Sequence, residues 1–370
     1  MNRLLVVLFV LVIATPMVLN VAGVDGADPA NENREMAPVP HWTGTWQSAT
    51  EYPEAFAHWF EDHFGLRARL VRWFGESRLF LLGVSPSTTV IKGRDGWLFY
   101  AEDGGVDDYV SKELLSPSDV NVWREALTRA DDWLRQRGIG YVFTIPPDKH
   151  VIYPEYMPSS IRPTGSVLRM DQIYGALSDT RVVAVDPRKA LIEAKARDRL
   201  YYITDTHWNE RGAFVAYQAI VEAVRQQVPA APPAWSRNDF EAVERVIAGK
   251  DLAGMLGMKG VLRETDLQLI PRRTRRAHVV EPAGADPTED WGRVVTEIAD
   301  PSLPRAVVFR DSFGSRLVPY LSEHFSRTVY LWQNDFDANV ILKERPDVVI
   351  QEIVGRHLYG FIASPELVPR

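Results

Sequence analysis

Residues 306–313 read AVVFRDSF, an apolar run followed at once by polar residues. The apolar part is typical of a strand buried on both faces of a parallel sheet. Similar apolar runs occur at 141–145, 182–185, 328–332 and 348–350. Helical patterns at about 209–227 and 313–325 fall between these runs. This alternation predicts an α/β sandwich with a mainly parallel sheet, in which ligands bind at the carboxyl ends of the strands.

Composition excludes several classes of protein. The chain has 370 residues, of which 46% are hydrophobic and 25% charged, so it is neither disordered nor fibrous. Its net charge of −7 argues against a general nucleic-acid binder. It has no cysteine, which excludes disulfide scaffolds, cysteine-ligated metals and cysteine nucleophiles.

The N-terminus carries a long uncharged segment, residues 4–24. About 20 apolar residues span a bilayer core, and Arg3 before the segment predicts that the start of the chain stays in the cytoplasm. Two interpretations remain open: an uncleaved signal anchor, or a signal peptide cleaved after the small residues of Val21-Ala22-Gly23. Both place residues 30–370 outside the cytoplasm.

Composition and pattern predict the organisation that follows. We expect an anchor at 1–25, a linker rich in Pro, Asn, Glu and Gly at 26–50, and one catalytic domain at 51–370. A helix is expected at 53–82. Asp95-Gly96 predicts a turn between strands at 88–91 and 97–100, and Ser116-Pro117 predicts the start of a helix that ends near Gly138.

Residues 229–304 are expected to be less regular. They contain four clustered arginines, Arg272, Arg273, Arg275 and Arg276. Either the cluster is a solvated loop, or it contacts an anionic polymer or headgroup.

Two short segments contain candidates for chemistry. Ser312 follows the strand at 306–309 and precedes an expected helix, whose N-terminus would favour a developing negative charge. Serine needs a base, and histidine with a carboxylate partner supplies one. The segment 204–209 offers His207 with Asp205 two residues before it, and Asn209 to cap the next helix. We therefore hypothesise a Ser312–His207–Asp205 triad.

Pattern alone leaves alternatives to this triad. Ser312 fits a helix cap and His207 a hydrogen-bonded structural histidine. Asp205 and His207 also fit a divalent metal site, which would need at least one further ligand. None of the other histidines falls in an H-x-x-x-H or H-E-x-x-H pattern.

Several motifs along almost the whole chain occur in one known order. They are Asn33–Pro38, Tyr52–Phe56, Glu61–Arg67, Lys92–Phe99, Pro146–Lys149, Tyr153–Glu155, Asp205–Trp208, Asp251–Ala253, Arg310–Phe313 and Arg345–Ile350. In this order the chain resembles the membrane-anchored, SGNH-hydrolase-like O-acetyltransferases of bacterial exopolysaccharides, the alginate O-acetyltransferase AlgJ/AlgX group or DHHW proteins.

The resemblance implies an SGNH-hydrolase-like three-layer sandwich, with the acetyltransferase domain at 51–370 behind one transmembrane helix. It also implies roles for individual residues. Ser312 would be the nucleophile, and His207 and Asp205 the base and its partner. The Ser312 N–H, then that of Phe313 or Gly314, would bind the oxyanion. Asn209 and Arg316 are possible helpers, and Trp208 either contacts the glycan or packs the loop.

The resemblance further implies an acetyl-enzyme, a polysaccharide acceptor and a multi-spanning membrane-bound O-acyltransferase as acetyl donor. No cofactor or metal is expected. The chain departs from the family at two places. Arg310 stands where a glycine is usual, and Gly355-Arg356 stands where a Glu-Arg pair is usual.

Two other functions stay compatible with these residues. An esterase or deacetylase would use the same triad with water as the acceptor. A non-catalytic component would bind or assemble polysaccharide without needing Ser312.

Overall fold

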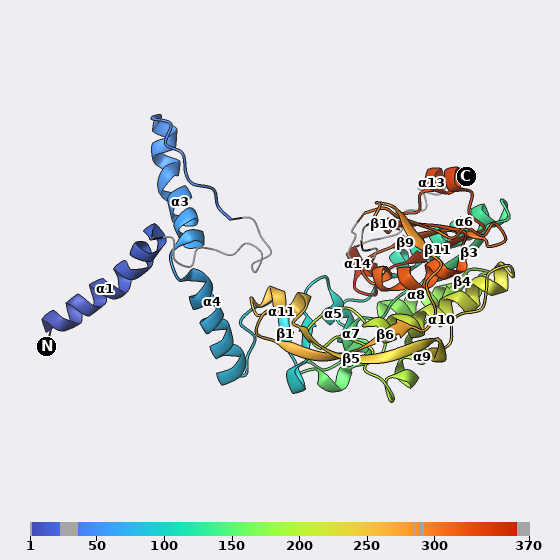
Figure 1. Ribbon diagram of the computed structural model, residues 1–370, viewed down its shortest axis with the longest axis horizontal. Coiled ribbons are helices and arrows are strands. Elements are labelled where there is room, and N and C mark those ends of the chain that lie inside the picture. The colour runs from blue at the N-terminus through green and yellow to red at the C-terminus, as the bar shows by residue number, and fades with distance from the viewer. Residues whose placement is uncertain (1, 23–35, 285, 287, 289–291, 361–370) are drawn as a thin grey trace. The chain divides into compact units, whose positions relative to one another are not determined.

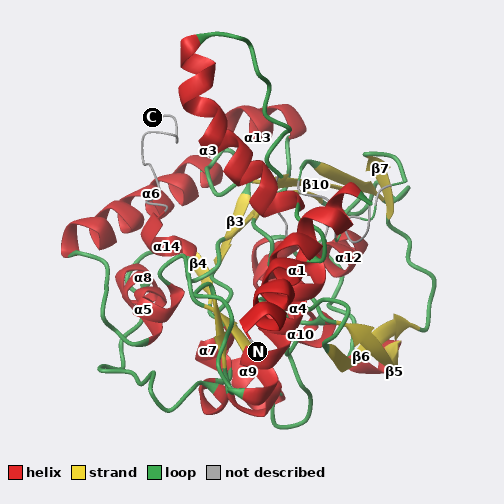
Figure 2. Cartoon of the chain, turned by 90° about the vertical axis from the view of Figure 1, so that its left-hand side faces the viewer, coloured by secondary structure: helices red, strands yellow, loops and turns green. Residues whose placement is uncertain are grey.

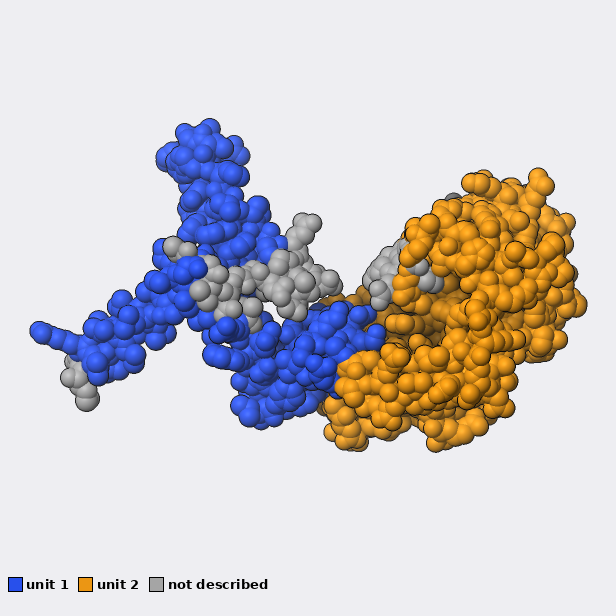
Figure 3. Space-filling view, viewed as in Figure 1, with its two compact units in different colours: residues 1–92, 248–263 blue, residues 93–247, 264–370 orange. Residues whose placement is uncertain are grey.

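The computed structural model describes residues 2–22, 36–284, 286, 288 and 292–360 (Figure 1). The described chain forms two compact units, coloured in Figure 3: unit 1 is residues 1–92 with 248–263, and unit 2 is residues 93–247 with 264–370. Part of the expected linker, residues 26–35, and the first three residues of the Asn33–Pro38 motif lie outside the described residues. The expected boundaries at residues 25 and 50 stay a prediction.

Unit 1 is mainly helical. Its elements are α1 (Asn2–Val21), α3 (Trp46–His63), α4 (Arg67–Glu76), the π-helical turn η1 (Ser77–Leu81), β1 (Val90–Lys92) and α11 (Asp251–Met255). Among the described helices, α1 is the one long and apolar enough to cross a membrane, with a mean hydropathy of 2.3 over Arg3–Asn20. The single helix expected at 53–82 is wrong, because Leu66 adopts a left-handed conformation (φ 67°) that separates α3 from α4.

Unit 2 is built on a seven-stranded sheet with the strand order β4-β3-β11-β9-β10-β8-β7. Five neighbouring strands are parallel, and β8 and β7 continue the sheet in antiparallel pairs. The expectation of a mainly parallel sheet is therefore confirmed. The strands are β3 (Gly140–Thr144), β4 (Val183–Val185), β7 (His278–Glu281), β8 (Val294–Glu297), β9 (Arg305–Arg310), β10 (Arg327–Trp332) and β11 (Val348–Glu352).

Helices cover both faces of this sheet. Alternate residues of the strands, such as Tyr141, Phe143, Val307 and Phe309, join the core with α6 (Pro117–Arg135), α8 (Arg169–Leu177), α13 (Ala338–Glu344) and α14 (His357–Gly360). The opposite face of β3 contacts α10 (Glu210–Gln227), which also contacts α9 (Arg188–Ala194) and α12 (Val318–Leu321). Figure 2 shows β3 and β4 between α6 and α8 on one side and α10 and α12 on the other.

Local signals in the sequence explain several boundaries. Ser116 caps α6 in a capping box with Asp119, Pro117 occupies the first helical position, and Gly138 follows with a φ of 71°. Between β1 and β2 (Leu98–Tyr100), Asp95 and Gly96 have φ values of 52° and 80°, as the expected turn requires. These predictions are confirmed.

The remaining elements of unit 2 are short. They are the 3-10 turns η2 (Arg94–Gly96), η3 (Pro154–Tyr156), η4 (Arg237–Asp239), η5 (Gly314–Leu317) and η6 (Ser322–His324), helices α5 (Gly105–Tyr109) and α7 (Lys149–Ile152), and a two-stranded ribbon of β5 (Phe240–Ala248) and β6 (Arg263–Pro271). The helix expected at 313–325 is present as one helical run over residues 314–324, in which α12 lies between the 3-10 turns η5 and η6. Residues 229–304 are more regular than expected, because they contain four strands.

The arginine cluster is packed against its own unit. The Arg273 guanidinium lies 3.8 Å from the centre of the Trp235 ring, and that of Arg275 donates to the Pro319 carbonyl oxygen. Arg276 forms an ion pair of 2.6 Å with Asp300. Residues 272–277 form a loop in which Arg272, Arg273 and Arg276 are exposed. The solvated loop considered above therefore fits the structure, although three of the four guanidinium groups also have protein partners.

Candidate active site

Asp205 and His207 are directly hydrogen-bonded in unit 2. The distance from His207 Nδ1 to Asp205 Oδ1 is 2.7 Å, and the same oxygen accepts the His207 backbone N–H at 3.2 Å. Asp205 is buried, whereas 17% of the His207 side chain is exposed. A carboxylate at Nδ1 places the proton on that nitrogen, so that Nε2 is the nitrogen that can act as a base.

A buried cation holds the backbone that leads to this pair. Lys149, at the start of α7, donates from Nζ to the carbonyl oxygens of Tyr202 and Ile203, each at 3.1 Å, and to that of Asp205. Burial lowers the pKa of Lys149 to about 7, although Asp205 and Glu264 oppose the shift. The ammonium therefore orients three backbone carbonyl groups within residues 202–205, at a cost in desolvation.

The carboxylate of Glu264, in β6, binds the backbone of the residues that precede Asp205. Glu264 accepts the backbone N–H groups of Ile203 at 2.8 Å and Thr204 at 3.0 Å, and also the Thr204 hydroxyl. Glu264 is itself buried. The two residues before Asp205 are thereby fixed by hydrogen bonds that a strand or helix would otherwise supply.

Asn209 ends the segment by capping α10. Its Oδ1 accepts the backbone N–H groups of Arg211 at 3.0 Å and Gly212 at 3.1 Å, so the predicted cap is confirmed. Its Nδ2 donates to the Arg199 carbonyl oxygen at 2.7 Å. Both ends of the buried Asn209 amide are thus used within the protein.

Trp208 joins this segment to the one that contains Ser312. Its Nε1 donates to the Phe313 carbonyl oxygen at 3.0 Å, and the His207 and Phe313 ring centres are 5.0 Å apart. Trp208 has no exposed surface. It therefore packs the loop, the alternative left open by the sequence, and does not present its ring to a glycan.

Ser312 is half-buried in the turn that follows β9. This turn is held by side-chain carboxylates. Asp311 accepts the N–H groups of Phe313 at 2.9 Å and Val354 at 2.8 Å, and Glu352 accepts the Asp311 N–H at 3.1 Å. Because the Phe313 N–H is engaged in this way, the N–H groups of Ser312 and Gly314 are the better candidates for binding an oxyanion.

Gly314 lies where no side chain fits. A Cβ atom there would come within 2.6 Å of the Arg310 Cβ and 2.7 Å of the Glu352 Oε2. The turn therefore needs glycine at this position for the close approach of β9 and β11.

The two carboxyl groups below the turn have opposite pKa shifts. Burial opposes ionisation of Asp311, but its hydrogen bond with His357 and the charges of His357 and Arg356 outweigh burial and lower its pKa. Burial and the neighbouring Asp311 raise the pKa of Glu352 well above its usual range. The pair thus keeps one negative charge, on Asp311.

Arg310 lies in the interior beside the serine turn. It is fully buried, and it donates to the Ser315 hydroxyl at 2.8 Å while its guanidinium lies 4.8 Å from the centre of the Trp332 ring. The arginine that replaces the usual glycine therefore holds the serine turn from the interior, through bonds to the Asp311 carbonyl oxygen and the Ser315 hydroxyl.

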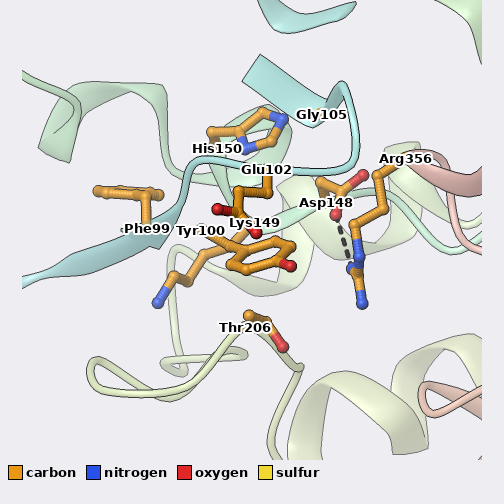
Figure 4. A pocket seen from close by; sticks show the side chains of 9 residues that line it. All are labelled: Phe99, Tyr100, Glu102, Gly105, Asp148, Lys149, His150, Thr206 and Arg356. Carbon is orange, nitrogen blue, oxygen red and sulfur yellow. Dashed lines mark hydrogen bonds and ion pairs between the residues drawn. The ribbon is translucent and has the colours of Figure 1, made fainter. Parts of the chain in front are cut away.

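A small polar pocket of about 10 Å³, room for about one water molecule, lies beside the acid–base pair (Figure 4). Its wall contains Thr206, whose hydroxyl is 3.1 Å from His207 Nδ1. Arg356 donates to Asp148 at 2.9 Å on the opposite wall, and its guanidinium lies 5.3 Å from the centre of the Phe313 ring. The other lining residues are Phe99, Tyr100, Glu102, Gly105, Lys149 and His150.

Asp148 and Arg356 are site residues to which sequence reasoning assigned no role. Asp148 follows β3 and Arg356 follows β11, while Ser312 follows β9, and these three strands are neighbours. The carboxyl-end rule could have found both, because it places polar residues after adjacent parallel strands at one edge of the sheet.

Arg316, in η5, lies near the pair on the serine side. Its guanidinium is 5.9 Å from the centre of the Tyr202 ring. Burial disfavours its charge, but Tyr202, Asp205 and Glu210 outweigh burial and raise the pKa of Arg316. It adds a positive charge beside the Asp205 carboxylate.

The Asp205–His207 bond fixes the orientation of the imidazole and leaves Nε2 as its reacting nitrogen. The Asp205 carboxylate and His207 Nδ1 bond to each other at 2.7 Å. A carboxylate in this position orients the imidazole of a serine triad, and it also orients a histidine that binds a metal through Nε2. The bond is therefore compatible with both alternatives.

Comparisons with known proteins match these features. The family model "SGNH hydrolase-like domain, acetyltransferase AlgX" matches residues 90–334. A probable alginate O-acetylase AlgJ of Pseudomonas putida is 33% identical over 146 residues, which cover 37% of this chain and 34% of that protein. A second probable AlgJ, from Pseudomonas syringae, is 26% identical over 50% of this chain and 44% of its own length. The matched part thus spans less than half of either relative.

A solved structure shares the fold. Bacillus cereus PatB1, in a structure with a sulfonyl adduct, has a TM-score of 0.54 and 18% identity, and the match covers 73% of this chain and 95% of that one. This likeness supports the SGNH-like architecture expected from the sequence.

Gly212→Ala should disturb the acid–base segment. A Cβ at Gly212 would meet the Leu200 carbonyl oxygen and come within 2.8 Å of the Trp208 Cβ. We expect a loss of about 1–3 kcal/mol in the free energy of unfolding, measured by urea denaturation. The control is Gly175→Ala in α8, where nothing lies within 4 Å, and which should stabilise by about 0.5–1 kcal/mol. Equal effects of the two changes would contradict the close packing described here.

Glu352→Gln should change the pH dependence of stability. The folded protein keeps the Glu352 proton while the unfolded chain loses it above about pH 4.5, so wild-type stability should fall as the pH rises from there towards the raised folded pKa. Glutamine does not ionise, and the variant should lack this fall. Urea unfolding at pH 4.5, 6 and 7.5 measures the difference, and parallel curves for the two proteins would refute a protonated Glu352.

Proposed function

The chain belongs to the SGNH hydrolase-like acetyltransferase AlgX family, and on that premise we propose that it is an O-acetyltransferase acting on an extracytoplasmic polysaccharide. The acetyl group would pass through Ser312. The observation that carries this proposal is the 2.7 Å Asp205–His207 hydrogen bond, in a segment that is bonded through Trp208 to the residue after Ser312.

In the first half-reaction, Ser312 Oγ attacks the carbonyl carbon of an acetyl donor while His207 Nε2 takes the serine proton. Asp205 stabilises the imidazolium that forms. The backbone N–H groups of Ser312 and Gly314 are the candidates to bind the oxyanion. Collapse of the tetrahedral intermediate breaks the bond to the leaving group, which receives the proton from His207, and leaves acetyl on Ser312.

In the second half-reaction, a sugar hydroxyl takes the place of the leaving group. His207 removes its proton as the oxygen attacks the acetyl carbon, and the intermediate collapses to the sugar ester. Ser312 recovers its proton from His207. The small pocket next to Thr206 does not hold a sugar ring, but the acidic and basic groups that line it are candidates for hydrogen bonds to the acceptor hydroxyl.

The location is also part of the proposal. Helix α1 has the length and hydropathy to span a bilayer, and Arg3 before it favours a cytoplasmic N-terminus. An anchor of this kind would hold the catalytic residues on the far side of the membrane. A multi-spanning membrane-bound O-acyltransferase is the donor that we propose, since it could deliver acetyl across the bilayer.

Ser312→Ala should abolish acetylation of the protein. The full-length chain in detergent would be incubated with 4-nitrophenyl acetate, and intact mass and nitrophenol release would be recorded with and without oligosaccharides. We expect the wild type to gain about 42 Da and to lose it when a suitable sugar is added. Ser312→Ala should show no adduct and at least a thousandfold slower turnover, by analogy with other serine triads at roughly 10³–10⁶.

The exposed serine at the end of α8, Ser178, supplies the matched control, and Ser178→Ala should behave as wild type. Ser312-dependent release that is indifferent to every sugar tested would favour an esterase. Equal activity of wild type and Ser312→Ala would favour a non-catalytic role. Activity lost on dialysis against EDTA and restored by Zn²⁺ would favour the metal alternative.

Asp205→Asn should slow acyl transfer with little change in folding. An asparagine at this position no longer stabilises the imidazolium and can favour the wrong tautomer of His207, and in a serine triad such a change costs about 10⁴ in rate. We expect a loss of about 10³–10⁴-fold in nitrophenol release, with an unchanged circular dichroism spectrum. A loss smaller than tenfold would show that Asp205 does not serve the catalytic base.

A further inference from the structure

Helix α4 and the turn η1 expose an apolar face. Leu70, Trp73 and Phe74 are at positions i, i+3 and i+4 and so share one side of α4. Trp73 is 61% exposed and Phe74 58%, and Leu81 at the end of η1 reaches 81%. Single exposed apolar residues are common, but a contiguous set of large ones indicates a surface that binds something apolar.

The opposite side of this segment is packed inside unit 1. Gly75 and Leu79 are buried, and a Cβ at Gly75 would come within 2.7 Å of the Met258 Cε. The segment thus packs its inner side against the residues after α11. The side that carries Phe74 faces outward.

The charges of the segment are mostly positive. Arg69 and Arg72 are exposed, Arg67 and Arg78 are partly exposed, and Glu76 is the one acidic residue between 67 and 82. The Arg78 guanidinium lies 5.6 Å from the centre of the Phe74 ring. A basic helix with an apolar face of large side chains is the pattern of helices that lie in the surface of anionic membranes.

Contacts within unit 1 place the start of α4 at one end of α1. The Gly65 N–H donates to the Pro16 carbonyl oxygen at 3.0 Å, and Asn20 donates from its side chain to the His63 carbonyl oxygen. A Cβ at Gly65 would come within 2.7 Å of the Asn20 N. The turn before α4 is therefore joined to residues 16–20, the end of α1 remote from Arg3.

We propose that residues 67–82 lie in the outer interface of the membrane, with Leu70, Trp73, Phe74 and Leu81 in contact with lipid. This inference rests on the proposed insertion of α1. If α1 spans the bilayer with Arg3 at the cytoplasmic side, residues 16–20 reach the opposite interface, and α4 begins there. The arginines then meet anionic headgroups, and Trp73 has the side chain most favoured at that depth.

The experiment uses the full-length chain in vesicles. Because the protein has no cysteine, Phe74→Cys and Leu81→Cys can each carry a single environment-sensitive fluorophore. The vesicles contain phosphatidylcholine with or without one quarter phosphatidylglycerol, and lipids with spin labels near the headgroup act as quenchers. We expect at least twofold stronger quenching at positions 74 and 81 than at Glu76→Cys on the same helix.

Two controls separate this inference from its premise. Val10→Cys in α1 should be quenched by spin labels deep in the acyl chains, and failure there would overturn the insertion of α1 and this inference with it, without bearing on Ser312. Arg69→Glu combined with Arg72→Glu should lower quenching at position 74 in the anionic vesicles.

Two results would overturn the inference directly. The first is fluorescence quenching at position 74 that is no stronger than at position 76, although the label at position 10 is quenched. The other is no quenching at position 74 by lipid in vesicles of this chain alone, together with a change in its fluorescence when a multi-spanning acyltransferase is added, because the occupant would then be a protein.

Discussion

The hydrogen bond from Trp208 Nε1 to the Phe313 carbonyl oxygen joins the two halves of the candidate site. The acid–base pair is in a loop that precedes α10, and the serine is in a turn about a hundred residues later, after β9. Neither segment has regular structure that would fix it in place. The bond is fully buried, and Phe313 also packs against the His207 ring, so a shift of either segment would break an interaction that water cannot replace.

Each half is in turn held by buried ionisable groups, which the interior would not retain for stability alone. Lys149 and Glu264 bind the backbone before Asp205, and Asp311 and Glu352 bind the backbone around Ser312. Burying such groups is costly, and apolar replacements are often as stable. These residues instead fix the orientation of the backbone, because each holds particular N–H or carbonyl groups in one position. Catalysis by a triad needs this positional accuracy more than it needs stability.

The parts of the fold that follow from local pattern could be predicted from the sequence. The apolar runs at 141–145 and 306–309 have the composition of buried parallel strands, and Ser116-Pro117 has the chemistry of a helix start. The helical run at 314–324 was expected from its apolar pattern, but the pattern did not reveal that Gly314 packs against Arg310 and Glu352. The antiparallel strands after residue 239 were missed for a related reason, since their partners are distant in the sequence.

The candidate site likewise has features that local sequence predicts and features that depend on distant parts of the chain. The Asp205–His207 bond is local and was expected, whereas the roles of Asp148 and Arg356 depend on which strands are neighbours. This matters for function, because an esterase and a transferase need the same three catalytic side chains. Selection between water and a sugar hydroxyl must come from groups that bind the acceptor and exclude water. In this chain the candidates for that role, Asp148 and Arg356, follow β3 and β11. Their arrangement depends on the order of the strands in the sheet and not on a motif around Ser312 or His207.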